Sequence, residues 1–436
     1  MKLELPKGMR DFPPEEMILR ESTITLLKNV FEKYGFNPMD TPSLERFNTL
    51  SAKYAGGDEI LKETFKLTDQ GKRKLGLRYD LTVPFSRFIG MNPQIRTPFK
   101  RYQIGKVYRD GPIKLGRYRE FTQCDVDIVG VDSAIADAEL LMLVAEVFEK
   151  LELKVRIKLN SRKIINAILE ALDCSEEDKI KFVLSLDKLE KIGVNGVIED
   201  LKERGVKNYN EMSLLLSTCK IDSIDELENY IKNAFKKKKK TFEDTESEKG
   251  FEEIKEILQY LKDNNADNVF FDGTLARGLA YYTGPVFEVF LEDSEIKSSV
   301  AGGGRYDKMI GDYLEDNRKY PATGISFGLE PILEAIKMKS KETKISVVKV
   351  FVIPINTLKE SLKIVQKLRK ENINSDIWSK ESGISKALDY ANKSKIPYVL
   401  IIGENELKLK QVKLKNMTSG EEKLISLDKA IKELKQ

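Results

Sequence analysis

The segment 107–130, VYRDGPIKLGRYREFTQCDVDIVG, carries the pattern that most restricts the fold of this chain. Two strand-like stretches flank a glycine-containing turn, which predicts an antiparallel hairpin. In the second stretch, side chains alternate with period two between an apolar and a polar face. The apolar face, which we expect to pack in a core, holds Cys124, Val126 and Ile128, and the other holds Arg119, Phe121, Gln123, Asp125 and Asp127. The polar face is either the floor of a binding site or a solvated sheet face with incidental salt bridges, and the segment alone leaves both interpretations open.

Histidine is absent from all 436 residues. This excludes Ser-His and Cys-His nucleophile arrangements and every histidine metal site. The cysteines, Cys124, Cys174 and Cys219, form no CxxC pair, which argues against a disulfide framework or a cysteine zinc site. Any catalysis must therefore use carboxylates, arginines and the substrate's own groups.

The composition is that of a globular chain of two or three domains, with 41% hydrophobic residues. Lys+Arg 74 against Asp+Glu 70 leaves a net charge of +4, so a nucleic-acid partner is permitted through local basic patches but is not required. The first residues are charged and no apolar run approaches the length of a membrane span. We expect a cytoplasmic protein that is neither exported nor inserted in a membrane.

The N-terminal part combines an antiparallel sheet with helices behind it. Apolar periodicity predicts helices at 13–33, 85–89 and 133–151, and strands at 64–69 and 74–82.

The rest of the chain changes character twice. Residues 160–255 are helix-rich and rich in Lys and Glu, which indicates an inserted helical module, and we interpret the run Lys236–Lys240 as a solvated loop. Strand signals resume at 268–291. Strands and helices alternate over 347–403, which predicts a small α/β domain with a largely parallel sheet, and 408–434 adds a strand, a turn and a helix.

Four further segments belong with the hairpin: LRYDLT (77–82), LARGLAYYTGPVFE (275–288), AGGGRYDKMIG (301–311) and ATGISFGLEPIL (322–333). Together, and in this order, they make the chain closely resemble the histidyl-tRNA synthetases, a family of class II aminoacyl-tRNA synthetases. RGLAYY and GGGRYD resemble the family's histidine-specific signatures, and the hairpin resembles class II motif 2. YDLTVPF and REFTQCDVD look closer to the archaeal and eukaryotic branch than to the bacterial one.

The resemblance implies a fold and an activity. It implies an α+β catalytic core, an antiparallel sheet flanked by helices, in residues 1–160 and 256–335. A helical insertion would occupy 161–255, and an α/β anticodon-binding domain 345–436. The implied reaction joins L-histidine and ATP into histidyl-adenylate and transfers the histidyl group to the 3′ end of tRNA(His).

For ATP, the resemblance implies that Arg109 grips the α-phosphate, because a planar guanidinium can bind two phosphate oxygens. Phe121 would stack on adenine. Either Arg119 or the turn residue Arg117 would reach the outer phosphates, and both alternatives remain.

Two further arginines follow from the signatures. Arg277 in LARGLAYY is the candidate catalytic residue, since in the family the corresponding arginine lies over the α-phosphate, where charge grows in the transition state. Arg305 either contacts phosphate or pairs with Asp307. The glycines of AGGG are expected to let the backbone approach a ligand.

For the amino acid, the resemblance implies two sets of groups. Convergent acceptors would hold the α-ammonium, and a carboxylate and a phenol would bracket the imidazole ring. The ammonium set is Asp80, Thr82 and Gln123, and the imidazole set is Asp127 and Tyr282. Tyr281 is also a candidate, although adjacent aromatics on a strand face opposite ways, so that one of Tyr281 and Tyr282 is expected in the core.

One position departs from the family. Motif 3 usually reads GLER, its arginine gripping the ATP γ-phosphate, and here Pro331 stands in its place. Proline suits a first helical turn, so the helix is expected to form without the charge. Arg305, Arg117 or Mg²⁺ bound with ATP are the candidate replacements.

The remaining expectations concern partners and rivals. Class II chemistry implies a homodimer, with TPSLE around Pro42 resembling the motif 1 interface segment. No set of protein side chains is assigned to a metal, so Mg²⁺ would arrive with ATP. The alternative functions are a non-catalytic regulator or sensor that binds histidine or tRNA, and a class II synthetase for another amino acid.

Overall fold

The computed structural model describes residues 2–51, 61–113, 118–171, 174–206, 214, 216–277, 281–315, 318–339, 345–380 and 383–435. The chain divides into two compact units. One comprises Met1–Arg10 with Thr23–Lys339, and the other Asp11–Ser22 with Ser340–Gln436.

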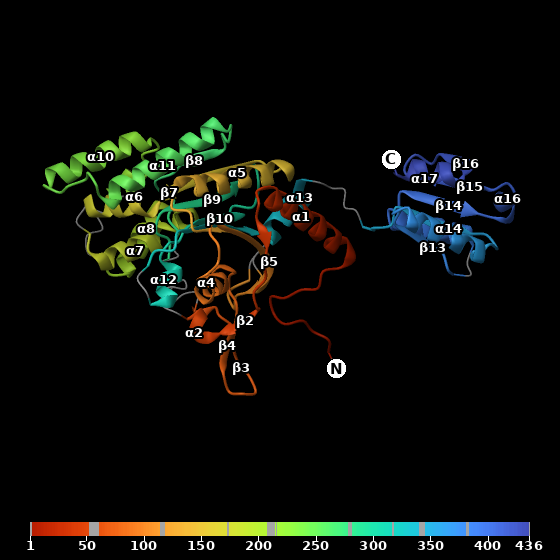
Figure 1. Ribbon diagram of the computed structural model, residues 1–436, viewed down its shortest axis with the longest axis horizontal. Helices are drawn as coiled ribbons and strands as arrows, with labels where there is room; N and C mark the ends of the chain where they lie inside the picture. The colour runs from red at the N-terminus through yellow and green to blue at the C-terminus, as the bar shows by residue number, and fades with distance from the viewer. Residues whose placement is uncertain are drawn as a thin grey trace. The chain divides into compact units, whose positions relative to one another are not determined.

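An eight-stranded sheet forms the centre of the first unit, in the order β1-β5-β6-β11-β10-β9-β7-β8 (Figure 1). Its strands are β1 (Asn37–Pro38), β5 (Phe99–Tyr108), β6 (Glu120–Val129), β7 (Val155–Ser161), β8 (Val269–Phe271), β9 (Pro285–Leu291), β10 (Ala301–Arg305) and β11 (Ala322–Gly328). From β5 to β7 all neighbours are antiparallel, and the edge strands β1 and β8 pair in parallel. β5 and β6 confirm the predicted hairpin.

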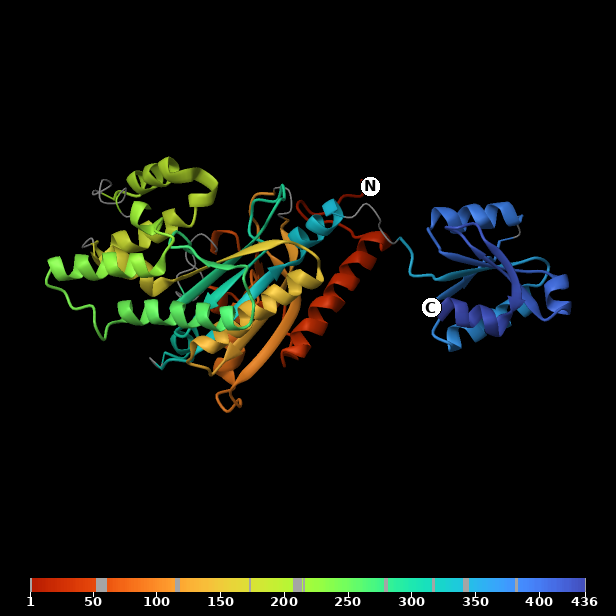
Figure 2. The same ribbon diagram turned by 90° about the horizontal axis from the view of Figure 1, so that it is seen from above.

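One face of the sheet packs against helices and contains the predicted apolar core. Cys124 and Val126 are fully buried and Ile128 is 1% exposed. Phe327 of β11 packs against Phe31 of α1 and Phe148 of α5, with ring centroids 5.6 and 6.0 Å apart. Figure 2 looks onto the helices of this side. They are α1 (Pro14–Lys33, here its second half), α5 (Ala134–Lys150), α11 (Glu246–Asp263) and α13 (Leu329–Lys339).

The opposite face is covered by short helices and a small sheet. These elements are α2 (Phe47–Leu50), α4 (Thr82–Met91), α12 (Met309–Leu314), and the strands β2 (Leu44–Arg46), β3 (Lys66–Thr68) and β4 (Lys74–Leu77), in the order β2-β4-β3. The strand predicted at 74–82 ends at Leu77. Beyond it, the Asp80 carboxylate accepts a hydrogen bond from the Val83 backbone N–H (3.0 Å) in the first turn of α4, which favours a helix there over a continued strand.

The segment predicted as a helical insertion is helical. It holds α6 (Arg162–Ala171), α7 (Glu176–Leu186), α8 (Leu189–Glu203), α10 (Ile224–Lys237) and α11. The lysine run is exposed, as expected. Lys236 and Lys237, however, belong to the last turn of α10 rather than to a loop. Positive charges are favourable in that turn because they interact with the negative end of the helix dipole. α11 continues beyond residue 255, so the domain boundaries stay a prediction.

The second unit has a five-stranded sheet in the order β13-β12-β14-β15-β16. Its elements are β12 (Val350–Pro354), α14 (Leu358–Lys370), β13 (Ser375–Ile377), α15 (Ile384–Lys393), β14 (Tyr398–Ile402), α16 (Glu404–Lys408), β15 (Gln411–Asn416), β16 (Glu422–Ser426) and α17 (Leu427–Lys435). β13, β12 and β14 are parallel, as predicted. The prediction of a single strand within 408–434 is wrong, because β15 and β16 form an antiparallel hairpin. β16 is an edge strand with exposed Glu and Lys side chains, so its sequence lacks the apolar alternation that identifies a strand.

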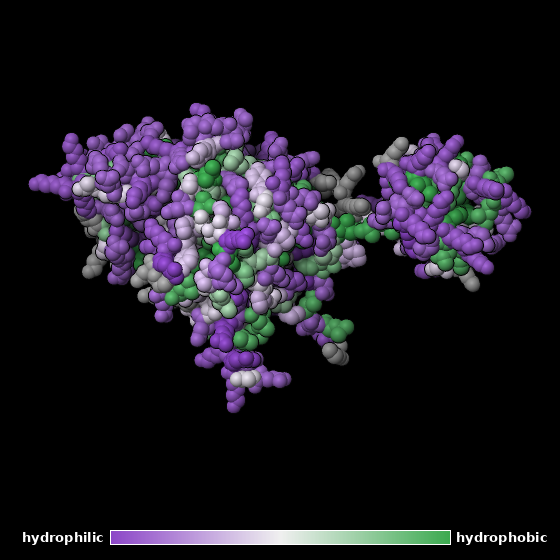
Figure 3. Space-filling view, in the orientation of Figure 1, coloured by the Kyte–Doolittle hydropathy of each residue, from purple (hydrophilic) through white to green (hydrophobic). Residues whose placement is uncertain are grey.

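The surface shown in Figure 3 is mainly hydrophilic. Among the described residues, no helix combines the length and the apolarity needed to cross a membrane.

We expect Phe327→Ala to lower the free energy of unfolding of the first unit by about 3–5 kcal/mol, because the ring is fully buried between α1 and α5. Urea unfolding would measure the change. Phe270→Ala is the matched control, since this ring on β8 is 41% exposed, and it should cost less than about 1 kcal/mol. Equal losses in the two variants would contradict this view of the core.

Candidate functional site

The polar face of β6 is the floor of a covered site. Asp125 and Asp127 are each 2% exposed. The interpretation of this face as a solvated surface is therefore wrong. Burial raises the pKa of the Asp125 carboxyl to about 7 and also raises that of Asp127, while the positive charge of Arg101 opposes both shifts.

Glycines on the neighbouring strands make room for the functional side chains. A Cβ added at Gly324 of β11 would lie 2.0 Å from Asp127 Oδ1, and one at Gly302 of β10 would lie 1.8 Å from Arg277 Nη1. The expected approach of the AGGG backbone to a ligand stays a prediction. Gly302 also accommodates a side chain of the protein itself, because a methyl group there would displace Arg277.

Asp127 has two buried partners that the sequence prediction missed. Arg101 Nη2 lies 2.7 Å from Asp127 Oδ2, and the Tyr306 hydroxyl donates to Asp127 Oδ1 (2.5 Å). Arg101 is directly opposite Asp127 in the β5–β6 register. Tyr306 belongs to the GGGRYD segment, whereas the only sequence signal for Arg101 was a charged residue within a strand.

The candidate ammonium-binding residues lie where α4 and β6 begin. Asp80 is 9% exposed, and burial raises the pKa of its carboxyl to about 6, against the charges of Arg109 and Arg101. Thr82 is the first residue of α4. Gln123 Nε2 donates to Ser326 Oγ (2.9 Å), and among the described residues Gln123 Oε1 has no hydrogen-bond partner.

Tyr281 and Tyr282 lie side by side rather than on opposite faces. Their ring centroids are 4.6 Å apart, and Tyr282 is 8% exposed. Both residues precede β9 and are not in a strand, so the alternation of a strand does not apply to them. The expectation that one of them contacts the core is confirmed, because Tyr281 packs against the core cluster that includes Tyr306. Burial raises the pKa of both phenols, and the Asp80 charge adds to the shift, which indicates that they share one site with that carboxylate. Gly304 lies behind the Tyr282 ring, since a Cβ there would be 3.0 Å from it.

The candidate ATP residues at the hairpin have the following contacts. Arg109 Nε donates to the Tyr79 carbonyl (3.1 Å), and its guanidinium lies 5.1 Å from the centre of the Phe121 ring. Arg119 Nη1 pairs with Asp110 Oδ1 at 2.7 Å. Arg117 lies outside the described residues.

Arg277 reaches the floor from the segment before β9. Its Nη1 lies 3.3 Å from the Phe287 carbonyl and 3.4 Å from Glu288 Oε1, and its guanidinium is 5.5 Å from the centre of the Tyr282 ring. Burial opposes its charge, but the Tyr282 and Glu288 charges raise the pKa of the guanidinium above its usual value. Arg277 is therefore a charged group beside the candidate imidazole bracket.

Arg305 has another role than phosphate contact in this structure. It is 5% exposed, and its Nη2 lies 2.6 Å from Asp137 Oδ2 and 3.0 Å from the Ser133 carbonyl at the start of α5. Asp307 Oδ1 is farther, at 3.5 Å from Nη1. The pairing alternative is favoured, with Asp137 as the main partner.

Pro331 lies in the first turn of α13, which forms as expected. The preceding residue, Glu330, is 2% exposed and its Oε2 accepts a hydrogen bond from the Thr122 backbone N–H (2.9 Å). This bond fixes the start of α13 to β6.

Comparisons with known proteins cover the whole chain. A family model described as histidyl-tRNA synthetase matches residues 8–332, and one described as anticodon binding domain matches residues 349–436. Histidine–tRNA ligase 1 of Bacillus cereus (strain ATCC 10987 / NRS 248) is 46% identical over 432 residues, which span 98% of this chain and 96% of that protein. Histidine–tRNA ligase of Clostridium tetani is 36% identical over 99% of this chain and 97% of its own length. These relatives are bacterial, and placement near the archaeal and eukaryotic branch stays a prediction.

Solved structures agree in fold. The histidyl-tRNA synthetase from Nostoc sp. PCC 7120 has a TM-score of 0.85 at 28% identity and covers 100% of this chain and 99% of its own. A protein from Bacillus halodurans, titled ATP phosphoribosyltransferase regulatory subunit/histidyl-tRNA synthetase, has a TM-score of 0.74 at 21% identity and shows the fold alone. By its family matches and its full-length relatives, the chain belongs to the histidyl-tRNA synthetase family, with a class II catalytic domain followed by an anticodon-binding domain.

Proposed function

We propose that the protein is an active histidine–tRNA ligase, which forms histidyl-adenylate from L-histidine and ATP and transfers the histidyl group to the 3′ end of tRNA(His). The observation that carries the proposal is the convergence of Asp80, Asp127, Arg109 and Arg277 on one covered sheet face. The relatives named above support it.

The amino-acid end would recognise histidine by complementary hydrogen bonds. The Asp127 carboxylate accepts from one imidazole N–H and the Tyr282 phenol serves the other ring nitrogen, while Asp80, Thr82 and Gln123 hold the α-ammonium. A buried site of this kind rejects isosteres that leave its polar groups unpaired, by a factor on the order of 10⁴. The unsatisfied Gln123 Oε1 supports the assignment, because it can accept a bond from the ammonium.

The phosphate end would work by position and charge. Arg109 grips the α-phosphate, Phe121 stacks on adenine, and Arg277 stabilises the charge that develops as the histidine carboxylate attacks phosphorus. In the second step a phosphate oxygen of the adenylate takes the proton from the tRNA ribose hydroxyl. Neither step requires a histidine side chain. Mg²⁺ is part of the proposal, since in ATP sites it takes most of its ligands from phosphate oxygens and water.

The remaining parts of the proposal concern the assembly and its setting. The core would comprise 1–160 and 256–335, with the insertion at 161–255 and the anticodon-binding domain at 345–436. We infer a cytoplasmic homodimer whose interface includes the TPSLE segment at 41–45. Leu44, 48% exposed in the isolated chain, supports this, because an exposed apolar side chain on a strand is suited to burial between subunits.

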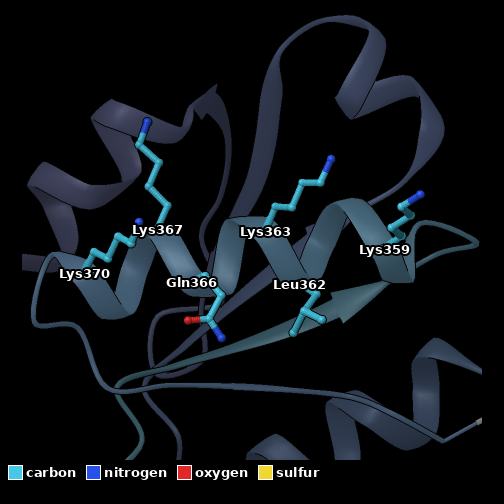
Figure 4. A pocket seen from close by; sticks show the side chains of 6 residues that line it. All are labelled: Lys359, Leu362, Lys363, Gln366, Lys367 and Lys370. Carbon is cyan, nitrogen blue, oxygen red and sulfur yellow. The ribbon is translucent and has the colours of Figure 1, made fainter.

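A row of lysines on α14 supports a tRNA surface in the second unit. A shallow pocket is lined by Leu362, Gln366 and four lysines, and Figure 4 shows Lys359, Lys363 and Lys367 projecting from one side of the helix. Lys367 pairs with Asp428 at 2.7 Å. Lys359 and Lys363 have no ion pair among the described residues, so we assign them to the tRNA phosphate backbone.

The alternatives are less well supported. A regulator would not need the anticodon-binding domain, and a sensor of histidine or tRNA would not need Arg277 beside Tyr282. A synthetase for another amino acid would not need the buried Asp127 carboxylate as an acceptor for an imidazole N–H. In this chain Arg101 and Tyr306 hold that carboxylate in place.

In ATP–pyrophosphate exchange across an amino-acid panel, we expect exchange with histidine alone. Arg277→Ala should lower kcat by about 10²–10³, because it removes a donor that acts in the transition state. Arg156→Ala is the control: this exposed arginine of β7 lies 5.0 Å from the Phe270 ring of the edge strand β8, and its loss should leave exchange unchanged. No exchange with histidine, together with retained histidine or tRNA binding, would favour the sensor.

We expect Pro331→Arg to lower the KM for ATP by about tenfold, because it restores a charged donor for the γ-phosphate. Pro331→Met removes the ring without adding charge and should leave that KM within about twofold. Steady-state exchange kinetics measure both. If the arginine variant behaves like the methionine variant, the γ-phosphate is held by other groups.

We expect the double substitution Lys359→Gln and Lys363→Gln to raise the KM for tRNA and to reduce the salt slope of tRNA binding by about 1 per lysine. ATP–pyrophosphate exchange, which needs no tRNA, should not change. Lys393→Gln on α15, whose lysine pairs with Asp389 at 2.8 Å, is the control. An unchanged salt slope in the double variant would remove α14 from the tRNA surface.

A further inference from the structure

Arg101 is the most completely buried charged side chain of the site, with 0% of its surface exposed. It extends from β5, and its guanidinium lies 4.2 Å from the centre of the Phe85 ring of α4. Nη2 is 2.7 Å from Asp127 Oδ2 and 3.3 Å from the Leu81 carbonyl, and Nη1 is 3.5 Å from Gln103 Oε1. A planar group with donors pointing in several directions suits this position.

The contacts of Arg101 join two parts of the site that are distant in sequence. Leu81 lies between Asp80 and Thr82, the candidate ammonium-binding residues, and Asp127 is the candidate imidazole acceptor. One guanidinium therefore contacts both the turn before α4 and the β6 carboxylate. Its position determines the spacing of the two ends between which an amino acid would bind.

Arg101 is also the cation common to the buried carboxyls of the site. Asp80 faces it from the turn before α4, and Asp125 and Asp127 face it from β6. Burial raises the pKa of each carboxyl, and the Arg101 charge opposes each shift. Arg109 opposes only that of Asp80. The other titratable groups around these acids are phenols, and burial raises the pKa of each: Tyr79, Tyr281, Tyr282, Tyr306 and Tyr313.

Asp125 adds a second observation. It is 2% exposed, and among the described residues its Oδ1 has no hydrogen-bond partner. The two carboxyls on β6 thus share one guanidinium as their cation, and each has one hydroxyl partner besides, Ser326 for Asp125 and Tyr306 for Asp127. Loss of that guanidinium would favour their protonated forms, and a protonated Asp127 loses acceptor capacity for a ring N–H.

We propose that Arg101 is a positioning residue for histidine specificity: it keeps Asp127 ionised and fixes the distance between that carboxylate and the 80–82 turn. The proposal rests on the proposed function, since it concerns the same amino-acid site. It concerns histidine alone, because the contacts described for Arg101 lie at the amino-acid end and none is with the candidate ATP residues Arg109, Phe121 and Arg119.

The test compares Arg101→Met and Arg101→Lys with the unmodified full-length protein in ATP–pyrophosphate exchange. For Arg101→Met we expect the histidine KM to rise about 100-fold or more, because removing one partner leaves an uncompensated buried carboxylate. The KM for ATP should stay within about threefold. The acid limb of kcat/KM for histidine should move to higher pH by about one unit or more, because without the cation the carboxylates ionise only at higher pH.

Arg101→Lys separates charge from bridging. Lysine keeps the positive charge, but its shorter side chain ends in one nitrogen, whereas the guanidinium contacts Asp127 and the Leu81 carbonyl through Nη2 and Gln103 through Nη1. We expect the acid limb to stay within about half a unit of the unmodified protein, with a histidine KM about tenfold higher. An unchanged histidine KM in this variant overturns the bridging role, including when the methionine variant fails to fold.

Arg204→Met is the matched control for the loss of an arginine–carboxylate pair. Arg204 follows α8 in the helical segment and donates from Nε to Asp200 Oδ2 (2.8 Å), outside the amino-acid site. It should lower the thermal midpoint without moving the acid limb. If Arg101→Met also lowers only the thermal midpoint, or raises both KM values equally with no shift of the acid limb, Arg101 is structural and the proposal is overturned.

Failure of the proposed function has a different signature. If the unmodified protein gives no exchange with histidine, the ligase assignment fails, and histidine affinity is then compared by calorimetry in the same variants. Weaker binding in Arg101→Met with an upward shift of its pH dependence supports the positioning role. Equal affinity in both proteins, or no histidine binding in either, overturns it.

Discussion

The site depends on keeping carboxylates charged inside a covered sheet face. Asp125 and Asp127 are each 2% exposed, and an ionised carboxylate in such surroundings is costly unless partners replace its water. Arg101 and Tyr306 supply those partners for Asp127, and Gly324 supplies the space. Because these groups come from β5, β10, β11 and their flanking segments, the site can hold its charge only when the central sheet is complete.

The absence of histidine gives this charge arrangement a further meaning. Histidine is the residue whose ordinary pKa lies near neutrality, and this chain has none. Burial raises the pKa of Asp80 to about 6 and that of Asp125 to about 7, so carboxyls titrate here in the range that histidine usually covers. The sensitivity of the site to pH therefore resides in acids, and the arginine beside them sets where that sensitivity lies.

Local patterns predicted the elements well where the periodicity is strict. The period of two in β6 separated Cys124, Val126 and Ile128 from the polar face, because alternation in a strand needs no knowledge of its neighbours. It could not show that the polar face was buried, since α4 and α12 arrive from elsewhere in the chain. The same limit hid Arg101, whose importance arises from its register opposite Asp127.

The errors, and the choice between alternatives that the sequence left open, have physical causes of the same kind. Arg305 follows three glycines that suggested a ligand, but its side chain turns to α5, where Asp137 and backbone carbonyls satisfy it. Tyr281 and Tyr282 were assigned opposite faces on the assumption of a strand, but β9 begins only at Pro285. β16 was missed because an edge strand exposed on one side carries charges in place of an apolar pattern.

The two ends of the proposed site differ in how replaceable their charges are. Phosphates are polyanions that several arginines and a Mg²⁺ ion can neutralise, and groups near solvent move to do so at little cost. At the amino-acid end, burial restricts each carboxylate to the partners that the fold provides, so that no mobile group substitutes for Arg101. On this reasoning a chain can carry Pro331 in place of a phosphate-binding arginine and still form a site for histidine.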